Sequence, residues 1–228
     1  MDRRTLVSMM AAGMASPFLR GTAAAQPAPK ARNIVLVHGL FADGSCWSEV
    51  IARLQPKGLQ VTSVQNPLTT LPEAVAAAQR VLAVQQGPTV LVGHSFSGMI
   101  VTEAGVDPKV SAVVYVAARA PDAGEDYTAL AKGFPTPPAS AGIVWSDDWG
   151  QLSEDAFLRD FAGDLPADKA RVLYAVQAPP GGRCLPARRP MRHGDRSRAG
   201  MPYRPKTGPL IRILNASWPS AWAQRRSR

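Results

Sequence analysis

The stretch Val90–Ile100, VLVGHSFSGMI, decides the fold of this chain. A short apolar run breaks into small residues around Ser95 and then becomes apolar again. This pattern predicts a strand, a sharp turn and a helix, with Ser95 at the tip of the turn. Such a turn holds a hydroxyl above the edge of a sheet, where a general base can reach it.

The residues around Ser95 meet the steric requirement of a nucleophile elbow. Small residues are needed two positions before and two positions after the nucleophile, because the strained turn brings their backbones into contact. Gly93 and Ser97 occupy these positions. This spacing is a weak signal alone, but an earlier strand-like run ends in His38-Gly39. We therefore predict that Ser95 is a nucleophile rather than an ordinary turn serine.

Apolar, β-rich runs alternate with amphipathic segments along most of the chain. The predicted strands are 33–37, 59–64, the run before Ser95, and 110–116, and helices are predicted between them. Strands of this kind, alternating with helices, predict an α/β fold with a doubly wound, mainly parallel sheet. Ligands bind such sheets at the carboxyl ends of the strands, where His38-Gly39-Leu40 and Ser95 fall. The first helix should face the core with Trp47, Val50, Ile51 and Leu54.

The residues from about 121 to 175 break this alternation. Loop-like segments rich in proline and glycine lead to a stretch for which we expect short helices around aromatic residues. We interpret this insertion as a helical cap over the active edge of the sheet. Ordinary core packing is expected for at least half of its aromatic side chains. These are Trp145, Trp149, Phe157, Phe161 and Tyr174.

The chain resembles the α/β-hydrolase superfamily, and more narrowly its small serine esterases and hydroxynitrile-lyase-like members. The resemblance covers residues 31–178 and is carried by VLVHGLFADGSCW (35–47), VGHSFSG (92–98) and VYVAA (114–118) followed by Pro121. It implies a carboxylic ester hydrolase that cleaves a small ester through an acyl-enzyme on Ser95, without a cofactor.

The resemblance also implies roles for the residues near Ser95. The oxyanion hole would consist of the backbone N–H groups of Leu40 and Phe96. His38 and His94 are not expected to act as general bases, because residues at these positions orient loops in the family.

The end of the chain departs from the family. Family members place an acid after a late strand and a histidine near the C-terminus. The histidine that follows Ser95 is His193, which lies with Asp195 in a basic, loop-like stretch. It would serve as the base only if the tail folded back over the elbow. Asp122 occupies a position where some hydrolases carry the acid, but a turn residue is the simpler interpretation.

Residues 179–228 have hardly any strand signal, so we expect the C-terminal strands of the sheet to be missing. Without an acid and a histidine, the chain would be a catalytically impaired hydrolase-fold protein that binds at most. This is the alternative to an active esterase.

A shifted reading frame would account for this tail. Reading the codons of Gly182 to Arg228 one nucleotide earlier, with free choice among synonymous codons, permits a peptide that continues the fold. The peptide contains an apolar strand, WYAVS, an acid-bearing loop, TEDRTINP, and an amphipathic helix, and it resembles the family at this point. We hypothesise that a single-nucleotide frame error near Pro179–Pro180 replaced the native C-terminus.

The positive charge is confined to the tail. The formal net charge is +9, and residues 179–228 hold 12 Lys and Arg with one acid, whereas residues 1–178 are nearly neutral. The hydrolase-like part has no basic surface interleaved with aromatic residues, so nucleic acid is not an expected partner.

The first residues are typical of an export signal. Arg3-Arg4, an apolar run and Ala23–Ala25 predict a signal over residues 1–25, resembling the twin-arginine type, and too short to span a membrane. We therefore expect a periplasmic or secreted protein, with a linker at 26–32 and one hydrolase domain at 33–178. Cys46 and Cys184 could form one disulfide after export, but neither has metal-ligand spacing.

Overall fold

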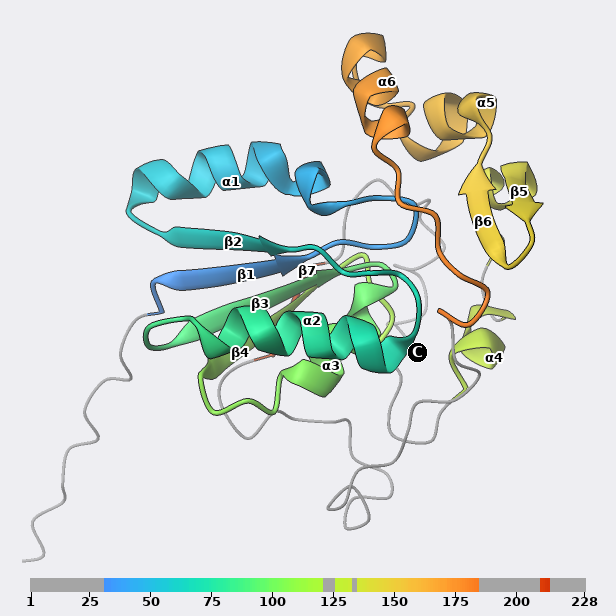
Figure 1. Cartoon of the computed structure of the whole chain (residues 1–228). Helices are drawn as coiled ribbons and strands as arrows, with labels where there is room; N and C mark the ends of the chain where they lie inside the picture. Colours follow the sequence, from blue (N-terminus) through green and yellow to red (C-terminus); the bar gives the residue numbers. More distant parts are fainter. Residues whose placement is uncertain (1–30, 121–125, 133–134, 185–209, 214–228) are drawn as a thin grey trace, which may run out of the picture.

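A computed structural model of the chain describes residues 31–120, 126–132, 135–184 and 210–213. A sheet with helices on both faces forms the larger part, and a second group of elements lies beyond one end of its strands (Figure 1). The predicted export signal, most of the linker, Asp122, His193 and Asp195 lie outside the described residues.

Four parallel strands form the centre of the sheet. They are β1 (Asn33–Val37), β2 (Gln60–Val64), β3 (Thr89–His94) and β4 (Val110–Val116), in the order β2-β1-β3-β4. All four strands were expected from the apolar runs. Because β1 and β3 are in register, the end of β1 lies beside the end of β3, with Val37 opposite Gly93. The predicted doubly wound α/β fold is confirmed.

A fifth strand departs from the sequence analysis. Residues Leu210–Ile213 form β7, which pairs in parallel with β4. We expected hardly any strand beyond residue 179. The physical reason is that LIRI contains two isoleucines, which favour strands, and that its pairing satisfies backbone groups at the outer edge of β4.

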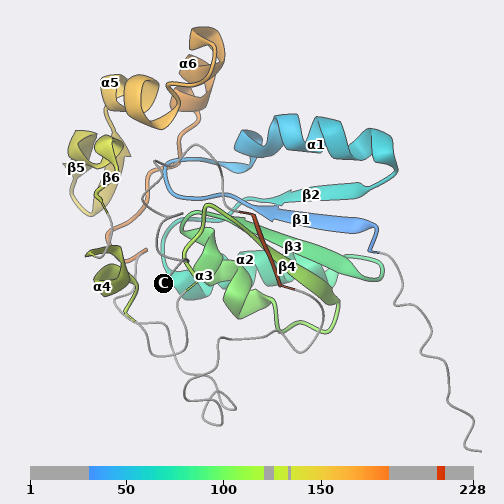
Figure 2. The ribbon, with the colours of Figure 1, turned by 180° about the vertical axis from the view of Figure 1, so that it is seen from behind.

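Helices cover both faces of this sheet (Figures 1 and 2). One face carries α1 (Ser48–Leu54), which lies between the 3₁₀ turns η1 (Gly44–Trp47) and η2 (Gln55–Lys57). The other face carries α2 (Leu71–Ala83) and α3 (Ser97–Ala104), whose apolar side chains make the main core with Val35, Val37 and Leu91. Two separate apolar layers therefore hold the sheet.

The predicted core stripe of the first helix is only partly correct. Trp47 is buried, but it belongs to η1, and no residue of α1 itself is buried. Val50 is 36% exposed. The helix covers its face of the sheet through half-buried Ile51, which packs on the layer containing Leu36 and Val92. Its outer residues stay in contact with solvent.

The second group of elements is the cap, which we define as residues 138–175. It follows α4 (Tyr127–Lys132) and has its own small apolar core around Leu152 and Phe157. Its elements are η3 (Pro138–Gly142), β5 (Ile143–Ser146), β6 (Trp149–Leu152), α5 (Glu154–Ala156), the π-helical turn η4 (Phe157–Phe161) and α6 (Ala167–Ala175).

The cap differs from the expected set of short helices because β5 and β6 form an antiparallel hairpin. Val144, Trp145 and Trp149 are residues that favour strands, and Asp147 turns the chain with φ 52°. Of the five cap aromatics, Phe157 is buried, whereas Trp145, Trp149 and Phe161 are exposed. The expectation that at least half of these side chains are core residues is therefore wrong.

Several contacts attach the cap to the sheet domain. The Lys169 ammonium of α6 lies 2.7 Å from a carboxylate oxygen of Glu49 in α1. The segment that follows α6 runs beside the hairpin, where the N–H of Gly150 donates to the carbonyl of Pro180 at 2.9 Å. The same segment reaches the sheet domain, since the N–H of Gly181 donates to the carbonyl of Leu68 at 2.9 Å.

The two cysteines are not joined. Cys46 is exposed, and Cys184 is fully buried in the main core. Burial raises the pKa of the Cys184 thiol to about 12, so the side chain is an apolar core residue at neutral pH. Across the described ranges, no helix combines the length and apolar character that crossing a membrane requires.

Candidate active site

Ser95 occupies a strained position directly after β3. Its φ is +55°, in the left-handed region that non-glycine residues rarely adopt. Two backbone hydrogen bonds hold the turn, because the Ser95 N–H donates to the carbonyl of Val116 at 3.2 Å and the Gly98 N–H donates to the carbonyl of Ser95 at 3.1 Å. The side chain is half-buried, so the turn presents its hydroxyl at the edge of the sheet.

The neighbouring glycines permit this turn for a steric reason. A Cβ at Gly93 would lie 2.7 Å from the Ser97 carbonyl oxygen. A Cβ at Gly98 would lie 2.0 Å from the carbonyl oxygen of Arg119, which follows β4. Both distances are shorter than any real carbon–oxygen contact, so only glycine fits at either position.

The loop after β1 lies against Ser95. A Cβ at Gly39 would be 3.0 Å from the Ser95 Cβ and 3.2 Å from the Nδ1 of His94. This close approach places the next residue, Leu40, at the same edge of the sheet as Ser95. Phe96 is fully buried and stands at the first turn of α3, where N–H groups have no acceptor within the helix. Three of the four predicted site residues, Ser95, Leu40 and Phe96, are thus brought together.

A buried polar network holds the loop after β1. The His38 carbonyl oxygen accepts hydrogen bonds from the Ser97 hydroxyl and from the Asn66 side-chain amide, the latter at 3.2 Å. Asn66 also accepts the Leu68 N–H at 3.0 Å through its side-chain oxygen. The loops after β1, β2 and β3 are therefore joined by side chains that are all at least nine-tenths buried.

His38 has no free nitrogen for catalysis. Its Nε2 accepts the backbone N–H of Asn66 at 3.1 Å, which assigns the ring proton to Nδ1, 2.9 Å from the Gly39 carbonyl oxygen. Burial lowers the pKa of His38, so the ring stays neutral. The lone pair that a general base needs is already engaged.

His94 packs in a different way. Its ring meets the Trp47 ring edge to face, with centroids 6.3 Å apart. Burial, and secondarily the nearby His38, lowers its pKa. No third histidine lies within the described residues, since His193 is outside them. The candidate base His193 therefore lies outside the part of the chain that the structure describes.

The same edge of the sheet concentrates backbone strain. Phe41, Leu68, Ser95 and Ala117 have φ between +42° and +58°, and each follows the carboxyl end of one of the four central strands. Such conformations cost about 1–3 kcal/mol each and cluster at functional sites. The strain therefore supports this edge as the candidate active site.

Among the described residues, no group of three or more His, Cys, Asp or Glu side chains is arranged to hold a metal ion.

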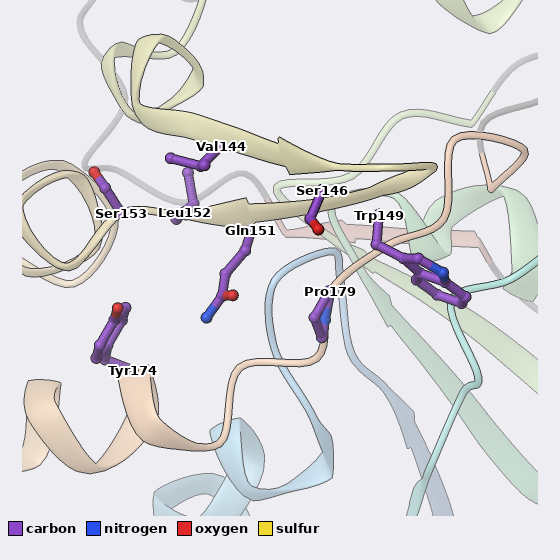
Figure 3. Close-up of a pocket in the computed structure, with 8 residues that line it drawn as sticks. All are labelled: Val144, Ser146, Trp149, Gln151, Leu152, Ser153, Tyr174 and Pro179. Atoms are coloured by element: carbon purple, nitrogen blue, oxygen red, sulfur yellow. The ribbon is translucent and has the colours of Figure 1, made fainter.

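A separate cavity of about 290 Å³ lies within the cap (Figure 3). One face of the hairpin lines it, and the Gln151 amide extends into the space that Tyr174 and Pro179 border. The remaining lining residues are Val144, Ser146, Trp149, Leu152 and Ser153.

Comparison with known families decides the identity of the fold. A sequence profile described as "Alpha/beta hydrolase family" matches residues 34–227. This chain belongs to the α/β-hydrolase family. This chain is also 27% identical, over 168 residues and 68% of each chain, to a carbendazim hydrolyzing esterase of Nocardioides sp. (strain SG-4G).

Solved structures agree with this assignment. A variant of the pyrethroid hydrolase PytH superposes with a TM-score of 0.62 and 16% identity, covering 82% of this chain and 89% of that chain. An extracellular α/β-hydrolase from a Paenibacillus species gives a TM-score of 0.54 at 19% identity, covering 72% of each. These likenesses show the fold.

Two residues that shape the candidate site were not predicted from the sequence. Asn66 joins the loops after β1 and β2, and Phe41 links the loop after β1 to the cap. The Asn66-Pro67 pair directly after a predicted strand marks a turn at the active edge and could have drawn attention to Asn66. Nothing in the local sequence distinguishes Phe41 from other apolar loop residues.

Proposed function

We propose that this protein is a serine hydrolase that cleaves small esters through an acyl-enzyme on Ser95. The Ser95 oxygen forms a bond to the acyl carbon, and the bond from that carbon to the alkoxy oxygen breaks. The alcohol leaves with the serine proton, and water then releases the acid. The observation that carries this proposal is the left-handed conformation of Ser95 between β3 and α3.

The oxyanion hole in this proposal consists of the N–H groups of Leu40 and Phe96. The contact between Gly39 and Ser95 supports the first donor, and the position of Phe96 at the start of α3 supports the second. Backbone donors of this kind stabilise the charge that develops on the carbonyl oxygen and require no cofactor.

The substrate class follows from the family and from the names of the relatives. The curated relative is called an esterase, and a structural relative is called a pyrethroid hydrolase. We infer a small-molecule ester as the substrate. The cap beside the active edge would line part of its binding site.

One observation favours the alternative, an impaired hydrolase-fold protein. Both described histidines are engaged or packed away from catalysis, since His38 bonds Asn66 and His94 lies against Trp47. Without a general base, the hydroxyl of Ser95 is not activated, and the rate of ester hydrolysis falls by several orders of magnitude. Under this alternative, the chain would hydrolyse esters only slowly.

We further propose that a frame error separates this chain from its native C-terminus. The alternative reading places a leucine at position 184, which is fully buried in the main core, and supplies the strand WYAVS, which would take the place of β7 beside β4. It also supplies an acid in the loop after that strand. Resequencing the DNA across the codons for Ala178 to Gly182 tests this proposal, and an intact frame would contradict it.

Export to the periplasm or medium is proposed from residues 1–25 alone. Fractionation of cells that express the full chain tests it. Mature protein beginning near Gln26 outside the cytoplasm is expected, whereas full-length protein retained in the cytoplasm would contradict export.

The function is tested by hydrolysis of p-nitrophenyl acetate. Slow hydrolysis is expected for the wild-type chain, with loss of this activity in Ser95→Ala. Ser48→Ala is the matched control, because Ser48 is an exposed serine on α1. Equal rates for the wild type and Ser95→Ala would reject an acyl-enzyme on Ser95 and favour the impaired alternative.

A further inference from the structure

Two consecutive residues of the loop after β1, which carries the proposed oxyanion donor, pack against different cores. Leu40 is half-buried against the main core of the sheet domain. Phe41 is half-buried against the core of the cap, which contains Leu152 and Phe157. The peptide that joins Leu40 and Phe41 therefore lies at the boundary between the cap and the sheet domain.

Phe41 is held in a conformation that it would not adopt freely. Its φ is +58°, which costs a bulky non-glycine residue about 1–2 kcal/mol. Its ring meets the Phe161 ring edge to face, with centroids 6.5 Å apart and an interplanar angle of 86°. Phe161 in turn packs on buried Phe157, with centroids 4.7 Å apart. Contacts with the cap thus oppose the backbone strain.

The two ends of the same loop are fixed by the sheet domain. At the start, Gly39 lies against Ser95, and the His38 carbonyl is bonded by Asn66. At the end, the Gly44 N–H donates to the side-chain oxygen of Gln65 at 3.1 Å. Between these anchors, Phe41 connects the loop to the cap.

We propose that Phe41 is a positioning residue that couples the placement of the cap to the backbone N–H of Leu40. The inference rests on the proposed oxyanion role of that N–H group. A cap displaced from Phe41 removes the contact that opposes the left-handed φ, and relaxation of φ rotates the Leu40–Phe41 peptide, which shifts the backbone of Leu40 and with it the N–H of the preceding peptide. The oxyanion donor is therefore aligned only when the cap is seated. Another attachment of the cap, Lys169 to Glu49, involves no residue of this loop.

Amide hydrogen exchange of the full chain tests the coupling directly. We expect peptides spanning residues 38–46 to exchange about tenfold faster in Phe41→Ala and in Phe161→Ala, since local opening becomes easier. The double variant should exchange like either single variant, because both remove one shared contact. Trp145→Ala is the control, as Trp145 is an exposed cap aromatic whose ring lies over Gly150.

Serine-directed inactivation by a fluorophosphonate separates positioning from stability. The maximal inactivation rate should fall about tenfold in Phe161→Ala, with little change in the concentration that gives half of that rate. Phe161→Tyr keeps the ring contact and should retain the wild-type rate. These variants leave the main core intact because Phe161 is 38% exposed.

Two results would overturn the proposal. One is unchanged exchange at residues 38–46 in Phe161→Ala, and the other is equal acceleration in Trp145→Ala. Failure of Ser95 to react in the wild type would reject the proposed function, but the exchange result would still decide whether the cap and the loop are coupled.

Discussion

The hydroxyl of Ser97 donates a hydrogen bond to the carbonyl oxygen of His38, which joins the first turn of α3 to the end of β1. Ser97 is also the small residue that the elbow requires two positions after Ser95. One side chain therefore meets the steric demand of the nucleophile turn and fixes the loop that carries the proposed oxyanion donor. The turn at Ser95 and this loop therefore belong to one hydrogen-bonded unit of the fold.

Asn66 should contribute strongly to that unit. In Asn66→Ala, the buried Leu68 N–H loses its acceptor and the His38 carbonyl loses one donor. We expect a loss of about 1–3 kcal/mol in the free energy of unfolding, measured by urea titration. Gln86→Ala, which removes an exposed amide, should leave the midpoint nearly unchanged. Equal urea midpoints for the two variants would show that the hydrogen bonds of Asn66 contribute little to the free energy of unfolding.

Gly98 should tolerate no side chain. In Gly98→Ala, the new methyl group would overlap the Arg119 carbonyl oxygen, so α3 must move away from the segment after β4. We expect the free energy of unfolding to fall by about 1–3 kcal/mol, measured by the same urea titration. Gly181→Ala is the control, since its new methyl group would meet other atoms only at 3.5 Å or more. A Gly98→Ala protein as stable as this control would disprove the proposed packing.

Stability should fall as the pH drops below about 6.5, the ordinary histidine pKa. Burial lowers the pKa values of His38 and His94 in the folded chain, so the unfolded chain binds protons first. The free energy of unfolding should decrease by up to about 1.4 kcal/mol per pH unit for each histidine, until the folded-state pKa is reached.

Urea titrations at pH 7.5, 6.0 and 5.0 measure this decrease. Removing one of the two titrating groups in His94→Gln should roughly halve the slope. The lowered carboxyl pKa values of Glu49, Glu73 and Asp160 belong to exposed groups and act at more acidic pH. A wild-type stability that is flat from pH 7.5 to 5.0 would contradict the buried, neutral state of both histidines.

The central sheet could be predicted because its local and tertiary preferences agree. The run Val110–Val116 is mostly apolar and contains four β-branched valines, and it forms β4 with the predicted bounds. The elbow was predictable for the same reason, since Gly93 and Ser97 satisfy a steric demand that acts over a few residues. Local sequence was therefore enough to predict the turn at Ser95 between β3 and α3.

The parts that escaped prediction depend on contacts between distant residues. The β5–β6 hairpin has a two-residue turn at Asp147-Asp148 without the glycine that usually signals one. The strand β7 forms because LIRI meets the free edge of β4, which periodicity within four residues cannot reveal. Asn66 and Phe41 acquire their functions only through side chains brought near by the fold.

Mapping a fluorophosphonate adduct tests the central claim, that Ser95 is a positioned nucleophile, most directly. The full chain is exposed to the probe for a prolonged period at mildly alkaline pH, digested, and examined by tandem mass spectrometry beside Ser95→Ala and Ser48→Ala. We predict a single adduct on Ser95 in the wild type and in Ser48→Ala, and none in Ser95→Ala. An adduct that persists in Ser95→Ala, or a wild-type chain that stays unlabelled, would contradict the claim.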